Sequence, residues 1–201
     1  MTFPSTPVLD TFDRANSGTL GSAWSEVFGI GARWGISGNL AAPQAAQSSE
    51  YWNATTYGDC EGYFTITTKP ANSTGSVTIG LRLGGVGSIA TFDGYAISVL
   101  PVTGTDIIRV QRVDNGSGTI LGSDLNQEVA VNDVFGARMV GSTIYVYLNG
   151  TEIMSRTDTT YTSGYIGIVA AETTTRINDF GGGAYVAPSR TGRGMLTMGV
   201  R

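Results

Sequence analysis

Short runs in which apolar and polar residues alternate constrain this chain more than any other feature of its sequence. In Ser76–Leu83 (SVTIGLRL) every odd position is apolar, and Arg82 shares the even positions with serine, threonine and glycine. Ser142–Asn149 (STIYVYLN) and Gly164–Ala170 (GYIGIVA) repeat this period of two. Side chains two positions apart share one face of an extended strand, so each run predicts a half-buried β-strand.

Turn-forming pairs separate these runs. Asn115-Gly116 and Asn149-Gly150 each lie between two apolar runs and supply the positive φ angles of a tight hairpin turn. The 201 residues include 29 glycines, and the sequence shows no convincing amphipathic helix. We therefore predict one all-β domain, an antiparallel β-sandwich over residues 1–186, followed by an extended basic arm over residues 187–201.

The charge of the chain is uneven along its length. Residues 1–186 carry nine basic and sixteen acidic groups, a net charge of −7, whereas residues 187–201 carry +3. Phosphate contacts need a basic face, so the acidic body argues against nucleic acid as a partner. No apolar run approaches the ~18 residues of a membrane span, and the N-terminus lacks the pattern of a signal peptide. The chain has no histidine, and its single cysteine, Cys60, cannot form an intrachain disulfide.

Several segments together resemble a known family. Val8–Glu26 (VLDTFDRANSGTLGSAWSE) and Ala32–Ala42 (ARWGISGNLAA) resemble the opening of concanavalin A-like lectin and glucanase domains of the laminin G-like jelly-roll type. Phe92–Val99, Val134–Asp158 and Ile177–Ala184 resemble later strands of that fold. The resemblance implies a concanavalin A-like jelly roll. Such domains are common in minor tail proteins and other virion surface proteins of bacteriophages.

This resemblance implies a non-enzymatic protein of the bacteriophage virion surface, either a minor tail protein or a capsid decoration. Its expected location is the virion. The expected partners are other virion proteins or copies of itself in a homo-oligomer, together with host cell-surface glycans. Two alternatives stay open, because a fold does not fix a function. One is a glycan-cleaving enzyme of the same fold, and the other is a stand-alone carbohydrate-binding module.

The acidic residues bear on the enzyme alternative. Glucanases of this family resemble one another in a strand with the pattern Glu-x-Asp-x-x-Glu, and glycoside cleavage needs two carboxyl groups about 5–10 Å apart. The sequence contains no such string, and its nearest acidic pairs are Asp10 with Asp13 and Asp59 with Glu61. We therefore predict that the protein is not an enzyme.

Aromatic and polar residues supply candidates for a glycan-binding face, because sugar sites combine an aromatic plate with a few polar groups. The polar sides of the predicted strands contribute Arg82, Tyr95, Arg109, Gln111, Tyr145 and Tyr147. The loop Ser48–Asp59 (SSEYWNATTYGD) adds Tyr51, Trp52 and Tyr57. The alternative is that these residues only cover the outside of a sheet, since the sequence does not fix strand register. Trp24 and Trp34 lie in the segments that resemble the family, and the resemblance implies that they belong to the core instead.

No cofactor is expected, and calcium is the one ion for which the sequence offers candidate ligands. Asp10 and Asp13 are expected near Asp179, because the first and last strands of the resembled fold pair with each other. Calcium prefers several carboxylate and carbonyl oxygens. The alternative is that these three acids cap turns or face water.

The C-terminal arm is predicted to serve assembly. Its basic and apolar residues are Arg190, Arg193, Met195, Leu196, Met198, Val200 and Arg201. A basic, partly apolar segment could add to the sheet edge of an acidic neighbouring copy. The alternative is an ordinary disordered chain end.

Overall fold

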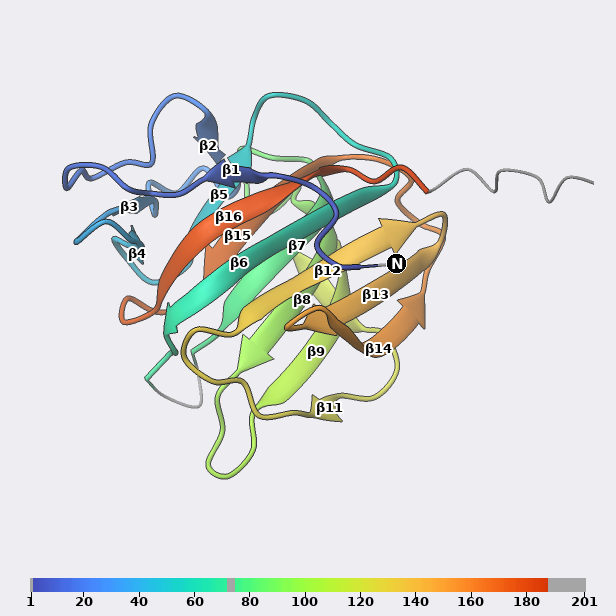
Figure 1. Ribbon diagram of the computed structural model, residues 1–201. Coiled ribbons are helices and arrows are strands. Elements are labelled where there is room, and N and C mark those ends of the chain that lie inside the picture. Colours follow the sequence, from blue (N-terminus) through green and yellow to red (C-terminus); the bar gives the residue numbers. More distant parts are fainter. Residues whose placement is uncertain (1, 72–74, 188–201) are drawn as a thin grey trace, which may run out of the picture.

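A computed structural model describes residues 2–71 and 75–187, which form sixteen β-strands and no helix. The strands make two antiparallel sheets that lie face to face as a sandwich (Figure 1). Sheet A contains, in spatial order, β14 (Thr151–Thr157), β13 (Thr143–Leu148), β12 (Val134–Val140), β6 (Cys60–Thr68), β16 (Arg176–Ala184), β4 (Ala41–Pro43) and β3 (Trp34–Ile36), with β1 (Val8–Asp10) also paired to β16. Sheet B contains β10 (Ser117–Ile120), β9 (Ile107–Asp114), β8 (Asp93–Leu100), β7 (Val77–Gly84), β15 (Tyr165–Ala170), β5 (Ser48–Trp52) and β2 (Trp24–Glu26), with β11 (Leu125–Asn126) also paired to β9.

The Asn-Gly pairs form the predicted hairpin turns. Asn115 and Gly116 connect β9 to β10 with φ angles of 47° and 74°. Asn149 and Gly150 connect β13 to β14 with φ angles of 51° and 79°. Positive φ at both central residues is the geometry that this residue pair favours. The predicted antiparallel β-sandwich is therefore confirmed, together with both hairpins.

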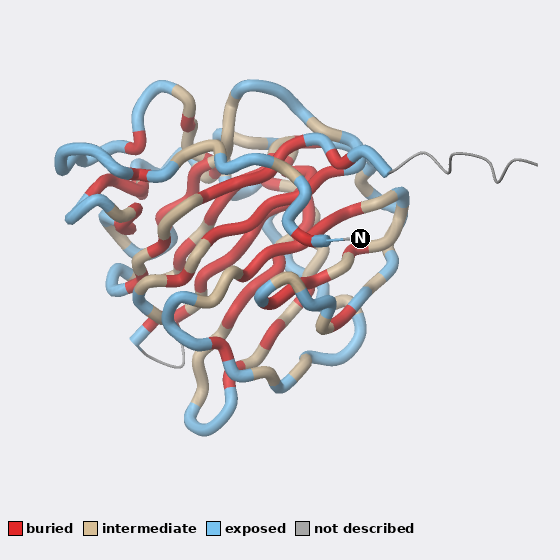
Figure 2. Tube along the Cα trace, viewed as in Figure 1, coloured by how far each residue is buried: buried red, intermediate tan, exposed pale blue. Residues whose placement is uncertain are grey.

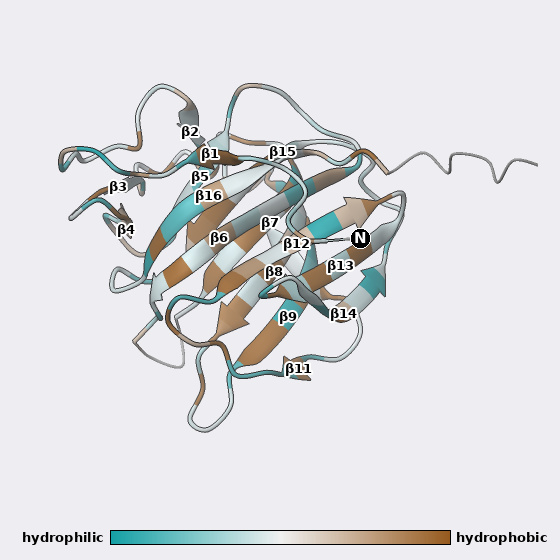
Figure 3. Cartoon of the chain, viewed as in Figure 1, coloured by the Kyte–Doolittle hydropathy of each residue, from teal (hydrophilic) through white to brown (hydrophobic). Residues whose placement is uncertain are grey.

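The core lies between the two sheets, where the central strands are buried (Figure 2) and apolar residues recur along them (Figure 3). Trp24 and Trp34 both belong to this core, as predicted. Each buried indole N–H has an acceptor: Trp34 Nε1 donates to the Ser48 carbonyl oxygen at 3.0 Å, and Trp24 Nε1 donates to Asp10 Oδ2 at 2.9 Å. Buried indoles need such partners, so these bonds fix the N-terminal strands against the core.

A β-bulge interrupts the alternation of β7 at Arg82, whose φ is +50°. Leu81 pairs with Tyr95 and Gly84 with Asp93, so three residues of β7 advance against two of β8. A bulge changes which face the following side chains occupy. Leu81 therefore packs in the core, whereas Leu83 packs in a second apolar cluster on the outer face of sheet B.

The side chain of Arg82 is buried, so its predicted place on a polar outer face is wrong. Its guanidinium donates to the carbonyl oxygens of Gly58, Gly141 and Tyr161, each at 2.8 Å. Gly58 precedes β6, Gly141 connects β12 to β13, and Tyr161 precedes β15. Arg82 thus ties loops from both sheets together at one end of the sandwich.

The N-terminal segment covers part of the outer face of sheet A, where it runs beside β6 and β12 (Figure 1). The ring of Phe3 stacks on Tyr147 with centroids 4.1 Å apart. The backbone N–H groups of Ser5 and Thr6 donate to Glu61 Oε2 at 2.8 and 3.1 Å. Beneath this segment, Arg138 Nε donates to Glu61 Oε1 at 2.6 Å, and both side chains are buried. The segment therefore shields an ion pair from water.

Candidate ligand-binding site

A cavity of about 300 Å³ opens on the outer face of sheet B. Its floor consists of small side chains from three central strands. Thr78 of β7 pairs with Ser98 of β8 and Val169 of β15, and Gly80 pairs with Ala96. Because paired residues share a sheet face, these five residues, none larger than valine, leave a depression between larger neighbours, and Val169 lies on its apolar side.

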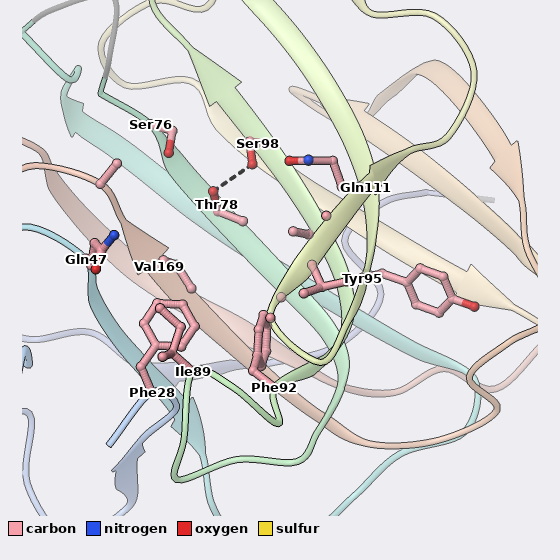
Figure 4. A pocket seen from close by; sticks show the side chains of 16 residues that line it. Phe28, Gln47, Ser76, Thr78, Ile89, Phe92, Tyr95, Ser98, Gln111 and Val169 are labelled. Carbon is pink, nitrogen blue, oxygen red and sulfur yellow. Dashed lines mark hydrogen bonds between the residues drawn. The ribbon is translucent and has the colours of Figure 1, made fainter. Parts of the chain in front are cut away.

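Polar groups line one side of the cavity (Figure 4). The hydroxyl groups of Thr78 and Ser98 are hydrogen-bonded to each other at 2.8 Å. Ser76 and Gln111 lie along the same side and add a hydroxyl and an amide. A hydroxyl group can donate once and accept twice, so the Thr78–Ser98 pair keeps capacity for a ligand.

Apolar groups line the other side, where Phe28, Ile89 and Phe92 gather (Figure 4). The rings of Phe28 and Phe92 meet edge to face, with centroids 5.3 Å apart and planes at 76°. Behind them lies Leu83, which the bulge has brought to this face, packed with Val27 in the same cluster. Gln47 also lies on this side, beside Phe28 and Val169, and adds one amide (Figure 4). The cavity is therefore mainly polar on one side and mainly apolar on the other.

Gly80 permits the close approach of Leu83 to the floor. A Cβ atom at Gly80 would lie 2.7 Å from a terminal carbon of Leu83, which is closer than real Cβ contacts occur. A side chain at this position would therefore push Leu83 away and disturb the apolar wall.

The loop that carries Phe28 is anchored by hydrogen bonds and a buried acid. Glu26 accepts a hydrogen bond from the N–H of Gly31 at 2.6 Å, and the Phe28 N–H donates to Ser49 Oγ at 3.3 Å. Arg33 lies between two carboxylates, 3.6 Å from Glu26 and 3.7 Å from Glu50.

Glu50 is almost fully buried, with 1% of its surface exposed. Burial raises the pKa of Glu50 to about 8, an effect that the Arg33 charge opposes and the Glu26 charge reinforces. Its Oε2 atom has no hydrogen-bond partner among the described residues. The protonated, neutral form of Glu50 therefore predominates near neutral pH. Its strand partner Ile168 belongs to the core, so Glu50 lies on the inner face of sheet B.

The predicted glycan-binding residues in the strands of sheet B have different surroundings. Gln111 lines the cavity. Arg109 lies on the same face, because it pairs with Ser98, but its guanidinium is bound to Asp124 at 2.7 Å. Tyr95 is fully buried in the core, and its hydroxyl donates to Asp158 Oδ1 at 2.8 Å. Tyr95 is also among the residues that line the cavity, but its ring points away from it (Figure 4), so its predicted position on a polar outer face is wrong.

The aromatic residues of the loop Ser48–Asp59 separate in the structure. Tyr51 lies on the outer face of sheet B, where the centroid of its ring is 4.5 Å from that of Tyr165. Tyr51 is not among the residues that line the cavity. Trp52 packs against the core and meets the Trp24 ring at 5.6 Å. Tyr57 also packs against the core. The structure does not assemble these three rings into one plate.

Tyr145 and Tyr147 lie on the opposite side of the molecule, on the outer face of sheet A. They line a second hollow of about 480 Å³ together with Arg138 and Tyr185. The Arg138 guanidinium lies 5.3 Å from the ring of Tyr147, which Phe3 covers. The nine predicted residues therefore do not form a single site, and glycan binding at Tyr145 and Tyr147 stays a prediction.

Sequence reasoning missed the apolar wall of the cavity. Phe28 lies in the segment Val27–Gly31 (VFGIG), and Ile89 lies in the glycine-rich turn before Phe92. An aromatic or branched residue flanked by glycines, outside any alternating run, was the available signal. Only the folded chain brings the two loops together: the Gly87 N–H donates to the Val27 carbonyl oxygen at 2.7 Å.

The predicted calcium ligands have protein partners. Asp10 binds the Arg14 guanidinium at 2.6 Å and accepts a hydrogen bond from Trp24. Burial works against ionisation of Asp10, but the bonds from Arg14, Phe12 and Trp24 outweigh it and lower its pKa. Among residues 2–71 and 75–187, no group of three or more acidic, cysteine or histidine side chains could hold a metal ion. Calcium binding by Asp10, Asp13 and Asp179 stays an untested prediction.

The predicted assembly residues lie outside the described residues. They are Arg190, Arg193, Met195, Leu196, Met198, Val200 and Arg201. In the described part of the chain, no helix is long and apolar enough to cross a membrane.

Comparisons with known proteins define the fold. The chain matches no protein-family model and no curated protein sequence. Among solved structures it is similar to the carbohydrate-binding module CBM66 from Bacillus subtilis, with a TM-score of 0.65 and 16% identity over 82% of this chain and 97% of that one. A Bacillus subtilis protein of unknown function with a galectin-like fold gives a TM-score of 0.62 and 12% identity over 90% of this chain and 97% of that one.

The β-glucanase of Bacillus licheniformis is also similar, with a TM-score of 0.61 and 12% identity over 88% of this chain and 97% of that one. At such low identity these likenesses describe the fold alone. The protein has the concanavalin A-like jelly-roll fold that the sequence predicts.

Proposed function

We propose that this protein is a carbohydrate-binding domain that holds a glycan in the cavity on the outer face of sheet B. The observation that carries the proposal is the arrangement of the cavity, with hydroxyl and amide groups on one side and an apolar wall on the other. A sugar ring needs both, because it presents hydroxyl groups at its edge and C–H groups on its faces. The likeness to a carbohydrate-binding module supports the same proposal.

Binding would use specific groups on each side. The hydroxyl groups of Thr78 and Ser98 and the amide of Gln111 would bond to sugar hydroxyls. Phe28 and Phe92 would exclude water from the opposite side of the ring. Groups held on paired strands of one sheet lose little freedom on binding, which favours affinity.

A glycan array followed by titration calorimetry tests the proposal. The protein should bind a defined subset of glycans, and Gln111→Ala should weaken that binding about tenfold, because an amide that bonds to ligand is lost. Gln44→Ala is the matched control, since Gln44 is exposed and lies outside the cavity. No binding to any glycan, or equal effects of the two substitutions, would contradict the proposal.

We propose further that the domain binds without cleaving its ligand. No described residue that lines the cavity is charged, so the cavity lacks the carboxyl pair that glycoside cleavage needs. Asp59 and Glu61 are engaged elsewhere: Asp59 with Arg82, and Glu61 with Arg138. Release of reducing ends from a bound polysaccharide by the pure protein would favour the enzyme alternative suggested by the β-glucanase fold.

The biological setting stays a proposal from the sequence. A place on a bacteriophage virion, with host cell-surface glycans as ligands and homo-oligomeric attachment through residues 187–201, is compatible with a carbohydrate-binding domain. A stand-alone carbohydrate-binding module fits the fold equally well. Deletion of residues 188–201, followed by measurement of oligomeric state and of association with virus particles, distinguishes the virion setting from the stand-alone module. If the deletion changes neither property, the proposed role of the arm in assembly loses its support.

A further inference from the structure

The cavity on sheet B is uncharged, and this limits the ligands that it can accept. Its polar lining consists of hydroxyl, amide and backbone groups, with no lysine, arginine, aspartate or glutamate among the described lining residues. Arg109, on the same sheet face, is already bound to Asp124 through two nitrogens at 3.0 and 2.7 Å. An ionised sugar would lose water here without gaining a counter-ion, which is strongly unfavourable.

The apolar wall differs from a flat stacking platform. The rings of Phe28 and Phe92 meet at 76°, so they do not present one continuous plane. The branched side chains of Ile89, Val113 and Val169 complete the apolar lining. Methyl groups and ring edges offer no hydrogen-bond partner. A hydroxyl group pressed against Phe28, Ile89 and Phe92, beyond the reach of the Gln47 amide at the edge of this wall, would therefore be left unsatisfied.

The two sides therefore demand different things of one ligand. The side formed by Ser76, Thr78, Ser98 and Gln111 fits an edge that carries hydroxyl groups. The opposite side, formed by Phe28, Ile89 and Phe92, fits a substituent that carries no hydroxyl group. An ordinary hexose carries a polar hydroxymethyl group, whereas a 6-deoxy sugar carries a methyl group at that position.

Resting on the proposed function, we infer that the cavity selects an uncharged sugar that bears an apolar substituent, such as the methyl group of a 6-deoxyhexose or an O-methyl ether. The hydroxyl-bearing edge of the sugar faces Thr78 and Ser98. The apolar substituent packs against Phe28, Ile89 and Phe92, where it replaces contacts with water.

Matched sugars test this inference. Glucose, galactose and mannose configurations are each presented to the full chain as the parent methyl hexoside, its 6-deoxy form and its 6-carboxylate form, and affinity is measured by calorimetry. In the configuration that binds, the 6-deoxy form should bind at least ~10-fold more tightly than the parent, which is the low end of discrimination by an apolar pocket. The carboxylate form should show no binding.

The outcomes separate the inference from the proposed function. Equal binding of the parent and 6-deoxy forms, or binding of the carboxylate form, would overturn the selectivity and leave carbohydrate binding intact. Absence of binding both to this set and to a broad glycan array would reject carbohydrate binding itself.

A substitution in the wall gives a second test. Ile89 is 42% exposed, so Ile89→Asn should leave the fold intact while adding an amide beside the apolar substituent. The preference for the 6-deoxy form should fall by at least threefold, because the parent hydroxyl group gains a partner. Val131→Asn, at an exposed position outside the cavity, is the control and should keep the preference. An unchanged preference in Ile89→Asn would count against the wall as its cause.

Discussion

The two outer sheet faces of this sandwich differ in what covers them. On sheet A, the N-terminal segment lies over a buried ion pair, and Phe3 stacks on Tyr147. On sheet B, Thr78 and Ser98, which are 5% and 6% exposed, form the floor of an open cavity, and the large side chains stand to one side. The same fold therefore seals one face with its own chain and leaves the other face available to a ligand.

One ion pair on each face differs in how far it is buried, and therefore in how much it contributes to stability. Glu61 and Arg138 on sheet A are both buried, whereas Arg109 and Asp124 on sheet B each keep about a quarter of their side-chain surface exposed (28% and 26%). Water screens the second pair, so it adds little stability. The Glu61–Arg138 pair is shielded from water, so removal of either partner would leave a buried charge without a counter-ion.

The largest expected effect comes from breaking the pair on sheet A. Arg138→Ala leaves Glu61 buried without its counter-ion, so the free energy of unfolding should fall by about 3–5 kcal/mol. Arg109→Ala, the matched change on sheet B, should cost less than about 1 kcal/mol. Urea unfolding measures both, and equal losses would mean that the two faces do not differ in this way.

The buried acid Glu50 of β5, in sheet B, gives a pH-dependent effect. The pKa of Glu50 rises from its ordinary 4.5 to about 8 on folding, so the folded state binds this proton more tightly than the unfolded state. The associated stability is fully present below pH 4.5 and is lost as the pH rises through 8.

Glu50→Gln should remove this loss. The difference in unfolding free energy between the protein and this variant should change by roughly 4 kcal/mol between pH 5 and pH 9, in favour of the variant at pH 9. Glu128→Gln, at an exposed position, is the control. Parallel pH profiles for the protein and Glu50→Gln would contradict the role of Glu50.

The bulge in β7 allows a comparison within one strand. Leu83→Ala removes a side chain that packs behind the wall of the cavity, and Leu81→Ala removes the same side chain from the core between the sheets. Each should cost about 2–3 kcal/mol of stability through the void left behind. Only Leu83→Ala should also weaken glycan binding, as calorimetry on the folded variants would reveal. Equal glycan affinities would show that the wall does not depend on Leu83.

The smallest expected effect is the loss of one hydroxyl group from the floor. Ser98→Ala removes a partner of Thr78 and a candidate ligand group, so glycan binding should weaken by about 1 kcal/mol, or roughly fivefold. Ser155→Ala, at an exposed position on sheet A, should leave the affinity unchanged. If Ser98→Ala binds the glycan as tightly as the unmodified protein, the glycan does not contact this floor.

Local patterns in the sequence were sufficient to predict the sandwich. Alternation marked β7, β13 and β15, and the Asn-Gly pairs marked two hairpins, because both signals depend on neighbouring residues alone. The tryptophans were assigned to the core through the family resemblance. These strands and turns are set by local sequence, so packing of the two sheets does not alter them.

The site was less predictable because it depends on register and on bulges. Alternation alone placed Arg82 with Thr78, but the bulge turned Arg82 toward the loops and Leu83 outward. Gln111 and Tyr147 looked equivalent in sequence, yet they lie on different sheets. The apolar wall joins two loops that are separated by about sixty residues of chain, a proximity that only tertiary structure creates.

The ties made by Arg82 have a consequence for the order of folding. Its three carbonyl partners lie 24, 59 and 79 residues away along the chain. Those carbonyl groups come together only when both sheets have formed and closed on each other, because each tie requires a long loop to be closed first. The Arg82 bonds therefore belong to the last stage of assembly, and they act chiefly as a brake on unfolding.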